Sequence, residues 1–333
     1  MMVTGPAPVS GYTKLAEVYF YIVTMCAFLS MVHGVFCSAI RTHRLKAFSA
    51  QASSQSESMD NPRTALTLYE QTQIGEILKW RAEVPSVMSK ALGVALSPVT
   101  WLIGKVVPEA AIRGVLDFSS GAAEWMTDTN DITRDAGVAS LGELRTLDLQ
   151  TSDRLANAVH NWAIGLAGAE GGLTGAGGLI GLAVDIPAVI VMALRTIHKI
   201  GACYGFSIET KEDRDFVLAI LAASGANDME EKVAALLTLR TIEVALAKQS
   251  WKKLAQKAAT EKLSREAGII TLKNLAKQLG VNLTKRKALQ AIPAVGAIVG
   301  ASVNGWYIKE VGWAARRAFQ ERWLIENEKV VDL

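Results

Sequence analysis

The chain has few of the residues from which catalytic and metal-binding motifs are built. Its 333 residues include three cysteines and four histidines. The histidines lie at positions 33, 43, 160 and 198, too scattered for a metal site, and neither a CxxC pair nor an HExxH motif occurs. An odd number of cysteines argues against a disulfide framework and indicates a reducing compartment. The sequence therefore predicts no metal and no cofactor.

Motifs for nucleotide binding and acyl transfer are missing as well. A glycine-rich segment begins at Gly171, but Ile180 stands where a GxGxxG motif that starts at Gly175 needs its last glycine. No GK[ST] sequence follows it, and no GxSxG motif occurs anywhere in the chain. An enzymatic role is therefore the weaker expectation.

Aromatic residues are scarce, which disfavours a fold built from sheets. They make up 7% of the chain, whereas alanine, leucine and glycine abound and the mean hydropathy is +0.23. No stretch alternates polar and apolar residues with period two. Since half of the residues are apolar, a sizeable core is available. We predict an all-α fold, a multi-helix bundle built around two glycine-rich apolar helices.

The two glycine-rich apolar helices are expected around Leu173–Leu194 and Ala288–Ile308. The second segment has no charged residue across 21 positions. Glycine costs about 1 kcal/mol against alanine inside a helix, so clustered glycines indicate close packing between helices. Pairs with GxxxG spacing would form the packing faces, namely Gly177 with Gly181 and Gly296 with Gly300.

Asp185 is a carboxylate in an otherwise apolar run. Because Pro187 follows two positions later, the spacing predicts that Asp185 caps a new helix over Ile186–Tyr204. The polar residues of this region are either a structural stripe or part of an enzymatic cleft, with Asp185 and His198 as an acid–base set. The candidate polar cluster consists of Glu170, Asp185, Arg195 and His198.

Charge is distributed unevenly along the chain. Residues 109–153 contain nine acids against three arginines, and residues 240–287 contain twelve lysines and arginines against three glutamates. Either these are solvated helix faces, or the basic stretch faces anionic lipid headgroups, where each cation contributes about 1 kcal/mol. The basic residues lack the interleaved aromatics that stack on bases, so nucleic acid is not an expected partner.

The expected contacts to lipid headgroups flank the second glycine-rich segment. A basic cluster precedes it, formed by Lys285, Arg286 and Lys287. At its other end Trp306 and Tyr307 resemble an aromatic belt at a membrane interface.

The N-terminal region is expected to be separate from the rest of the chain. Val18–Ile40 has no charged residue over 23 positions, enough to cross about 30 Å of hydrocarbon as a helix. Basic residues follow this run, so a single-pass anchor there would leave the remainder at the cytoplasmic face of the inner membrane. The alternatives are a natural start at Met59 and a signal peptide. We therefore divide the chain into an N-terminal extension, 1–58, and a helical domain, 59–333.

Several of these segments together resemble the EcsC protein family. The resemblance extends over residues 61–325 and is absent from the extension. It rests on Tyr69-Glu70 through Trp80 with Pro85, on Gly171 to Asp185-Ile-Pro187 with Arg195 and Tyr204-Gly205, on Thr284 to Lys287 through Ile292-Pro293, Gly296, Gly300 and Asn304, and on Ala314 to Phe319. The family takes its name from a protein encoded beside the components of an ABC transporter, which implies a bacterial, membrane-linked accessory role and no catalytic residue.

Three functions follow from the sequence. The first is a membrane-associated accessory protein that binds membrane lipids or membrane proteins, with an ABC transporter as the partner that the resemblance implies. The second is an enzyme with a hydrophobic cleft close to the membrane. The third is a soluble helical scaffold in which both glycine-rich helices are buried against each other.

Overall fold

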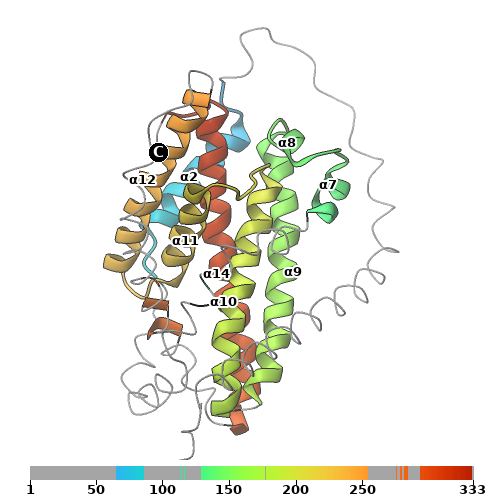
Figure 1. Ribbon diagram of the computed structural model, residues 1–333, viewed down its shortest axis with the longest axis vertical. Coiled ribbons are helices and arrows are strands. Elements are labelled where there is room, and N and C mark those ends of the chain that lie inside the picture. Colours follow the sequence, from blue (N-terminus) through green and yellow to red (C-terminus); the bar gives the residue numbers. More distant parts are fainter. Residues whose placement is uncertain are drawn as a thin grey trace, which may run out of the picture. The chain divides into compact units, whose positions relative to one another are not determined.

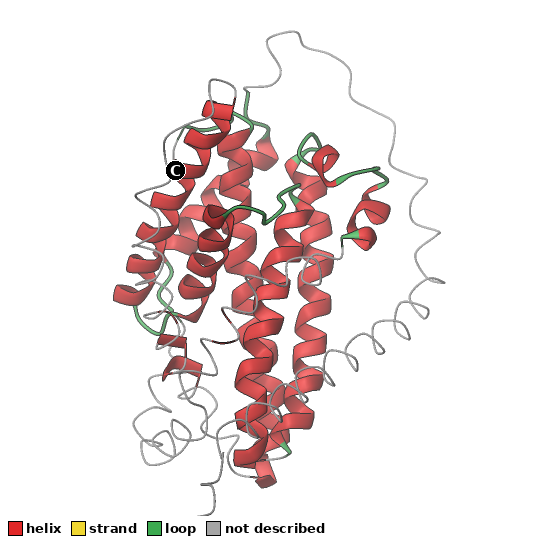
Figure 2. Ribbon diagram, in the orientation of Figure 1, coloured by secondary structure: helices red, strands yellow, loops and turns green. Residues whose placement is uncertain are grey.

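Every described element of the computed structural model is a helix. The structure describes residues 65–85, 114, 116, 129–176, 178–253, 275, 278–279, 281–283 and 293–331, and of 178–184, 247–253 and 293–300 it describes the backbone alone. These residues belong to one compact unit, Asn61–Leu333, and contain no strand (Figure 2). The predicted all-α bundle is therefore confirmed.

Three long helices run side by side along the unit (Figure 1). They are α9 (Leu149–Gly175), α10 (Gly178–Cys203) and α14 (Pro293–Glu326). Helices α9 and α10 form an antiparallel hairpin, and α14 packs along both of them. The side chain of Asp148 caps α9 by accepting a hydrogen bond from the Thr151 amide at 2.8 Å. Pro293 begins α14, where its missing N–H leaves no helical bond unmade.

The other described helices, the longest of which is nearly as long as α10, lie toward one end of this three-helix core (Figure 1). They are α2 (Leu68–Ala82), α7 (Asn130–Ala136), α8 (Leu141–Leu144), α11 (Lys211–Gly225) and α12 (Met229–Lys253). Helix α11 packs against α12 and α14, and α2 lies against α9 and α14. Capping boxes begin α2 and α11, formed by Thr67 with Glu70 and by Thr210 with Asp213.

The aromatic part of the core lies where α10, α11 and α14 meet. Phe319 of α14 stacks on Tyr204 and Phe206 and contacts Phe216 edge to face. These four rings are at most 1% exposed. Gly201 lies against the Phe319 ring, so closely that a Cβ there would be 2.6 Å from a ring carbon. A helix backbone without a side chain at this position therefore makes room for the ring.

The first glycine-rich segment is divided, which differs from the prediction of one helix over Leu173–Leu194. Helix α9 ends at Gly175 and α10 begins at Gly178, so the glycines surround the turn of the hairpin. The predicted N-cap at Asp185 is also wrong, because α10 runs through Asp185 and holds Pro187 inside it. The Asp185 carboxylate bonds to side chains of neighbouring helices.

Other boundaries agree more closely with the sequence pattern. Apolar residues recur at helical spacing over 230–257, which corresponds to α12, and from Leu66 to Trp80, which corresponds to α2; Thr67 caps α2, which ends before Pro85. Helix α14 continues far beyond the predicted end at Ile308. The extension 1–58, with Val18–Ile40, lies outside the described residues.

Candidate functional site

A buried amide bridges two carboxylates where α9, α10 and α14 meet. The Nδ2 of Asn304 donates to Oε2 of Glu170 at 2.8 Å and to Oδ1 of Asp185 at 2.7 Å. Thr174 donates from its hydroxyl to the same Asp185 oxygen at 2.8 Å. Asp185 and Asn304 are fully buried and Glu170 is 8% exposed. We call these four residues the carboxylate–amide bridge.

Among the described residues, the bridge lies in an end of the three-helix core with almost no other ionisable group. We call this the uncharged end, consisting of 161–175 of α9, 178–194 of α10 and 293–308 of α14. Glu170 and Asp185 are the acids in these ranges, which contain no lysine, arginine or histidine. Since burying an isolated charge is costly, the two carboxylates are held by hydrogen bonds inside the bundle.

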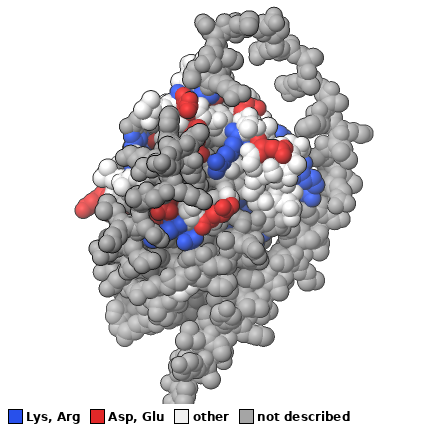
Figure 3. Space-filling view, turned by 45° about the horizontal axis from the view of Figure 1, so that its top comes forward, with Lys and Arg blue, Asp and Glu red and all other residues white. Residues whose placement is uncertain are grey.

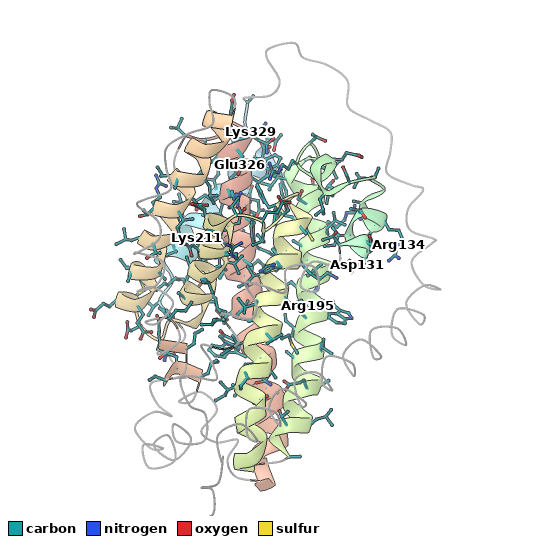
Figure 4. The ribbon with its side chains drawn as sticks, viewed as in Figure 1. Asp131, Arg134, Arg195, Lys211, Glu326 and Lys329 are labelled. Carbon is teal, nitrogen blue, oxygen red and sulfur yellow. The ribbon has the colours of Figure 1, made fainter. Side chains whose placement is uncertain are left out.

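The opposite end of the unit has a different surface. Seen obliquely from that end, the described surface carries basic and acidic side chains intermixed (Figure 3). The labelled charged residues of Figure 4 likewise belong to this part, and Arg195 is the one closest to the uncharged end. Over the described residues, the three long helices therefore run from a charged end to an uncharged end.

The candidate polar cluster is brought together only in part. Glu170 and Asp185 meet through Asn304, but Arg195 and His198 follow Asp185 on the same helix. Ten and thirteen residues along a helix correspond to about 15 and about 20 Å, so an Asp185–His198 acid–base pair is not formed. Burial of His198 lowers its pKa to about 4, which leaves the imidazole neutral at neutral pH.

The structure describes only some of the glycines predicted from the sequence and none of the basic cluster. Gly181 lies in α10, and Gly296 and Gly300 lie in α14, where the structure describes the backbone. The other predicted residues lie outside the described residues, namely Gly177, Lys285, Arg286 and Lys287.

A close approach of α9 and α14 occurs at glycines that the sequence pattern did not single out. A Cβ on Gly305 would lie 3.9 Å from the Gly168 Cα and 3.7 Å from the Ile164 carbonyl oxygen.

The two aromatic residues predicted at a membrane interface differ in exposure: Trp306 is half-buried, but Tyr307 is fully buried. Tyr307 is therefore not part of an interfacial belt, contrary to the prediction.

A second buried polar cluster at the charged end joins α2, α9, α14 and the turn that follows α10. The Asp153 carboxylate accepts hydrogen bonds from the Tyr69 hydroxyl at 2.6 Å, from Gln320 at 2.7 Å and from the Tyr204 hydroxyl. Burial, with the neighbouring Asp153 charge, raises the pKa of both tyrosines. Both phenols therefore remain donors at neutral pH, and the cluster has the satisfied bonds of a structural core.

A third cluster contains a carboxyl group without a hydrogen-bond partner among the described residues. Glu321 of α14 is paired with Arg81 of α2 and lies 3.7 Å from Arg240 of α12. Glu243 of α12 is 3% exposed, and neither of its oxygens has such a partner. Burial and the nearby Glu321 charge raise the pKa of Glu243. The described residues contain no cluster of three or more metal-binding side chains.

The fold and the carboxylate–amide bridge define a class of helical-bundle protein that is polarised between a charged and an uncharged end. The family model described as "EcsC protein family" matches residues 71–324. The chain therefore belongs to the EcsC protein family, which confirms the resemblance seen in the sequence.

Two relatives from Bacillus subtilis (strain 168) are similar to this chain. "Uncharacterized protein YdbA" is 25% identical over 281 residues, which cover 77% of this chain and 93% of that protein. "Protein EcsC" is 26% identical over 162 residues, which cover 49% of this chain and 59% of that protein. No solved structure matches the chain.

Proposed function

We propose that this protein is a membrane-associated accessory protein that binds membrane lipids or membrane-protein partners and catalyses no reaction of its own. The observation that carries the proposal is the carboxylate–amide bridge. In a bilayer a polar group needs a partner inside the protein, and one carboxylate oxygen of Glu170 and one of Asp185 accept hydrogen bonds from neighbouring helices. A bundle end with its acids turned inward can leave water at low cost.

The hydropathy of α10 supports the same function. Its stretch Asp185–Cys203 is long and apolar enough to cross a membrane, and 94% of it is buried inside the protein. Because other helices pack around this stretch, any contact with lipid must be made by the helices that surround α10. The family relationship supports a membrane protein, such as an ABC transporter, as the partner class. The basic residues that follow Val18–Ile40 support the cytoplasmic face of the inner membrane as the location.

Fractionation of the native full-length protein tests this function. We expect the protein in the membrane pellet after a high-salt wash, because apolar contact is insensitive to salt whereas peripheral charge contact is screened. Flotation with protein-free lipid vesicles then separates the two partner classes, since a lipid-binding protein floats without any membrane protein. Recovery of all the protein in the soluble fraction before any wash would refute membrane association.

A further inference from the structure

The outward face of α9 changes character halfway along the helix. Exposed residues recur every three or four positions from Gln150 onward. The first four are polar, namely Gln150, Arg154, Asn157 and Asn161, and the next four are not, namely Gly165, Ala169, Leu173 and Ala176. Leu173 is 69% exposed. A surface helix in water normally keeps polar residues along its whole outer face, so the second half has the pattern of a helix that faces an apolar medium.

The charged residues of α14 begin at the same level. The His160 ring nitrogen Nε2 lies 3.0 Å from the carbonyl oxygen of Lys309, which places these positions of α9 and α14 opposite each other. Lys309 is the first charged residue of α14 and is exposed. Trp162, half-buried, lies beside this level, as tryptophan does at membrane interfaces.

The length of the uncharged end lies between the thickness of one leaflet and that of the whole hydrocarbon core. From His160 to the end of α9 is fifteen residues, or about 22 Å, and from Lys309 back to Pro293 is about 24 Å. From Arg195 back to Gly178 is about 25 Å. These lengths exceed a single leaflet of about 15 Å and fall short of the full hydrocarbon thickness of about 30 Å.

We propose that the outer face of α9 from Gly165 to Ala176 lies against the acyl chains of a lipid bilayer, which the uncharged end enters from one side to about 22–25 Å. This inference rests on the proposed membrane association and names the surface that makes the contact. Acyl chains are the partner that fits, because this half of the face offers no charge or hydrogen-bonding side chain that a polar partner would need. The level of Lys309 then lies at the interface.

Site-specific fluorescence on the full-length protein tests the proposal. Cys26 and Cys37 are replaced by serine, and buried Cys203 is retained. A single cysteine carrying an environment-sensitive dye is placed at Ala169 or Ala176, with Arg154 and Asn157 of the same exposed face as matched controls. The protein is bound to phosphatidylglycerol–phosphatidylcholine vesicles that carry a nitroxide quencher in the middle of the acyl chain.

The expected result is a blue shift and a loss of fluorescence at 169 and 176, with neither effect at 154 and 157. Two positions are used so that a variant that fails to fold does not decide the outcome. If the protein binds the vesicles while the dyes at 169 and 176 stay in water, the inference is overturned and membrane association stands. If these dyes are already shielded without vesicles, another part of the chain or a second copy covers the face and the inference is also overturned. If the protein does not bind vesicles and does not pellet with membranes, both proposals fail.

Discussion

The Nδ2 of Asn304 lies 2.7 Å from Oδ1 of Asp185 and joins α14 to α10 inside the uncharged end of the bundle. Asp185 is placed in the middle of a continuous helix, where its side chain points to neighbouring helices instead of capping a backbone amide. The bond links one position of α14 to one position of α10. The carboxylate–amide bridge is thus the polar centre of an otherwise apolar three-helix contact.

Replacing Asn304 by leucine removes the donor that serves both Glu170 and Asp185. Leaving a buried acceptor without its donor costs about 1–3 kcal/mol, and two acceptors lose this donor, so we expect the free energy of unfolding to fall by about 3 kcal/mol. Chemical denaturation followed by circular dichroism measures it. Asn161→Leu, at an exposed position of α9, is the matched control and should change stability by less than about 0.5 kcal/mol. Equal stability of the two variants would show that the bridge does not hold the helices together.

Two glycines of α14 should respond oppositely to alanine. At Gly312 a Cβ would lie 2.0 Å from the His160 ring, which is held by the Lys309 carbonyl, and overpacking of this kind costs about 1–3 kcal/mol. At Gly305 the nearest atom would be 3.7 Å away, so the higher helix propensity of alanine should stabilise the protein by up to about 1 kcal/mol. Thermal unfolding of both variants checks the sign. The His160→Ala change should relieve the Gly312→Ala defect, and a defect that persists would argue against the contact.

Acid should destabilise the protein through its two buried histidines. Burial lowers the pKa of His160 and His198 to about 4 from 6.5, so the unfolded chain takes up protons before the folded one does. The contribution of each neutral histidine to the free energy of unfolding is therefore fully present above the unfolded pKa. It falls by about 3 kcal/mol as the pH drops from about 6.5 to about 4.

The measurement is the free energy of unfolding at about pH 7.5 and about pH 4.5. His198→Asn should reduce the difference between the two values by about 2–3 kcal/mol, whatever it does to the stability at neutral pH. A difference that is the same in the variant and the parent protein would mean that His198 is not excluded from protonation in the fold.

Glu243 should behave as a neutral carboxyl group. Because burial and the Glu321 charge raise its pKa, the folded state binds this proton more tightly than the unfolded chain, and stability is lost as the pH rises above the ordinary value of 4.5. Arg81, Arg240 and Arg322 also face this group and partly offset the effect. We expect Glu243→Gln to be more stable than the parent protein, by a margin that grows from about pH 5 to about pH 8.

Glu321→Gln is the matched control for this prediction. It removes the carboxylate that pairs with Arg81 and Arg240, so it should destabilise the protein at the same pH values. Denaturation curves of both variants across the pH range make the comparison. A margin for Glu243→Gln that shrinks with rising pH would show that Glu243 is ionised in the fold.

The helices were predictable from the sequence where the pattern is local. The recurrence of apolar residues at helical spacing locates α2 and α12, and the charged turn at Lys211 marks the start of α11. The break between Gly175 and Gly178 was not found, because GxxxG spacing presupposes a continuous helix while the same glycines also suit a turn. The choice between them depends on how α14 packs against the hairpin.

The carboxylate–amide bridge could be predicted only in part. Asp185 and Asn304 each stand out as polar residues in apolar runs, which marks them as candidates for buried contacts. Their pairing could not be found, because 119 residues separate them and no local spacing encodes the contact. The polarity change along α9, in contrast, is visible in the sequence once residues 154, 157, 161, 165, 169, 173 and 176 are taken as one face.

Photo-crosslinking in membranes tests the central claim, that the uncharged end of the bundle contacts lipid, most directly. A photoreactive amino acid replaces Leu173 in the full-length protein, and in a second variant it replaces Leu237 of α12, which is similarly exposed at 64% but lies on a helix packed against α11 and α14. We predict lipid adducts at position 173 and few at position 237. Equal lipid labelling at the two positions would contradict the account. So would crosslinks from position 173 to protein and none to lipid.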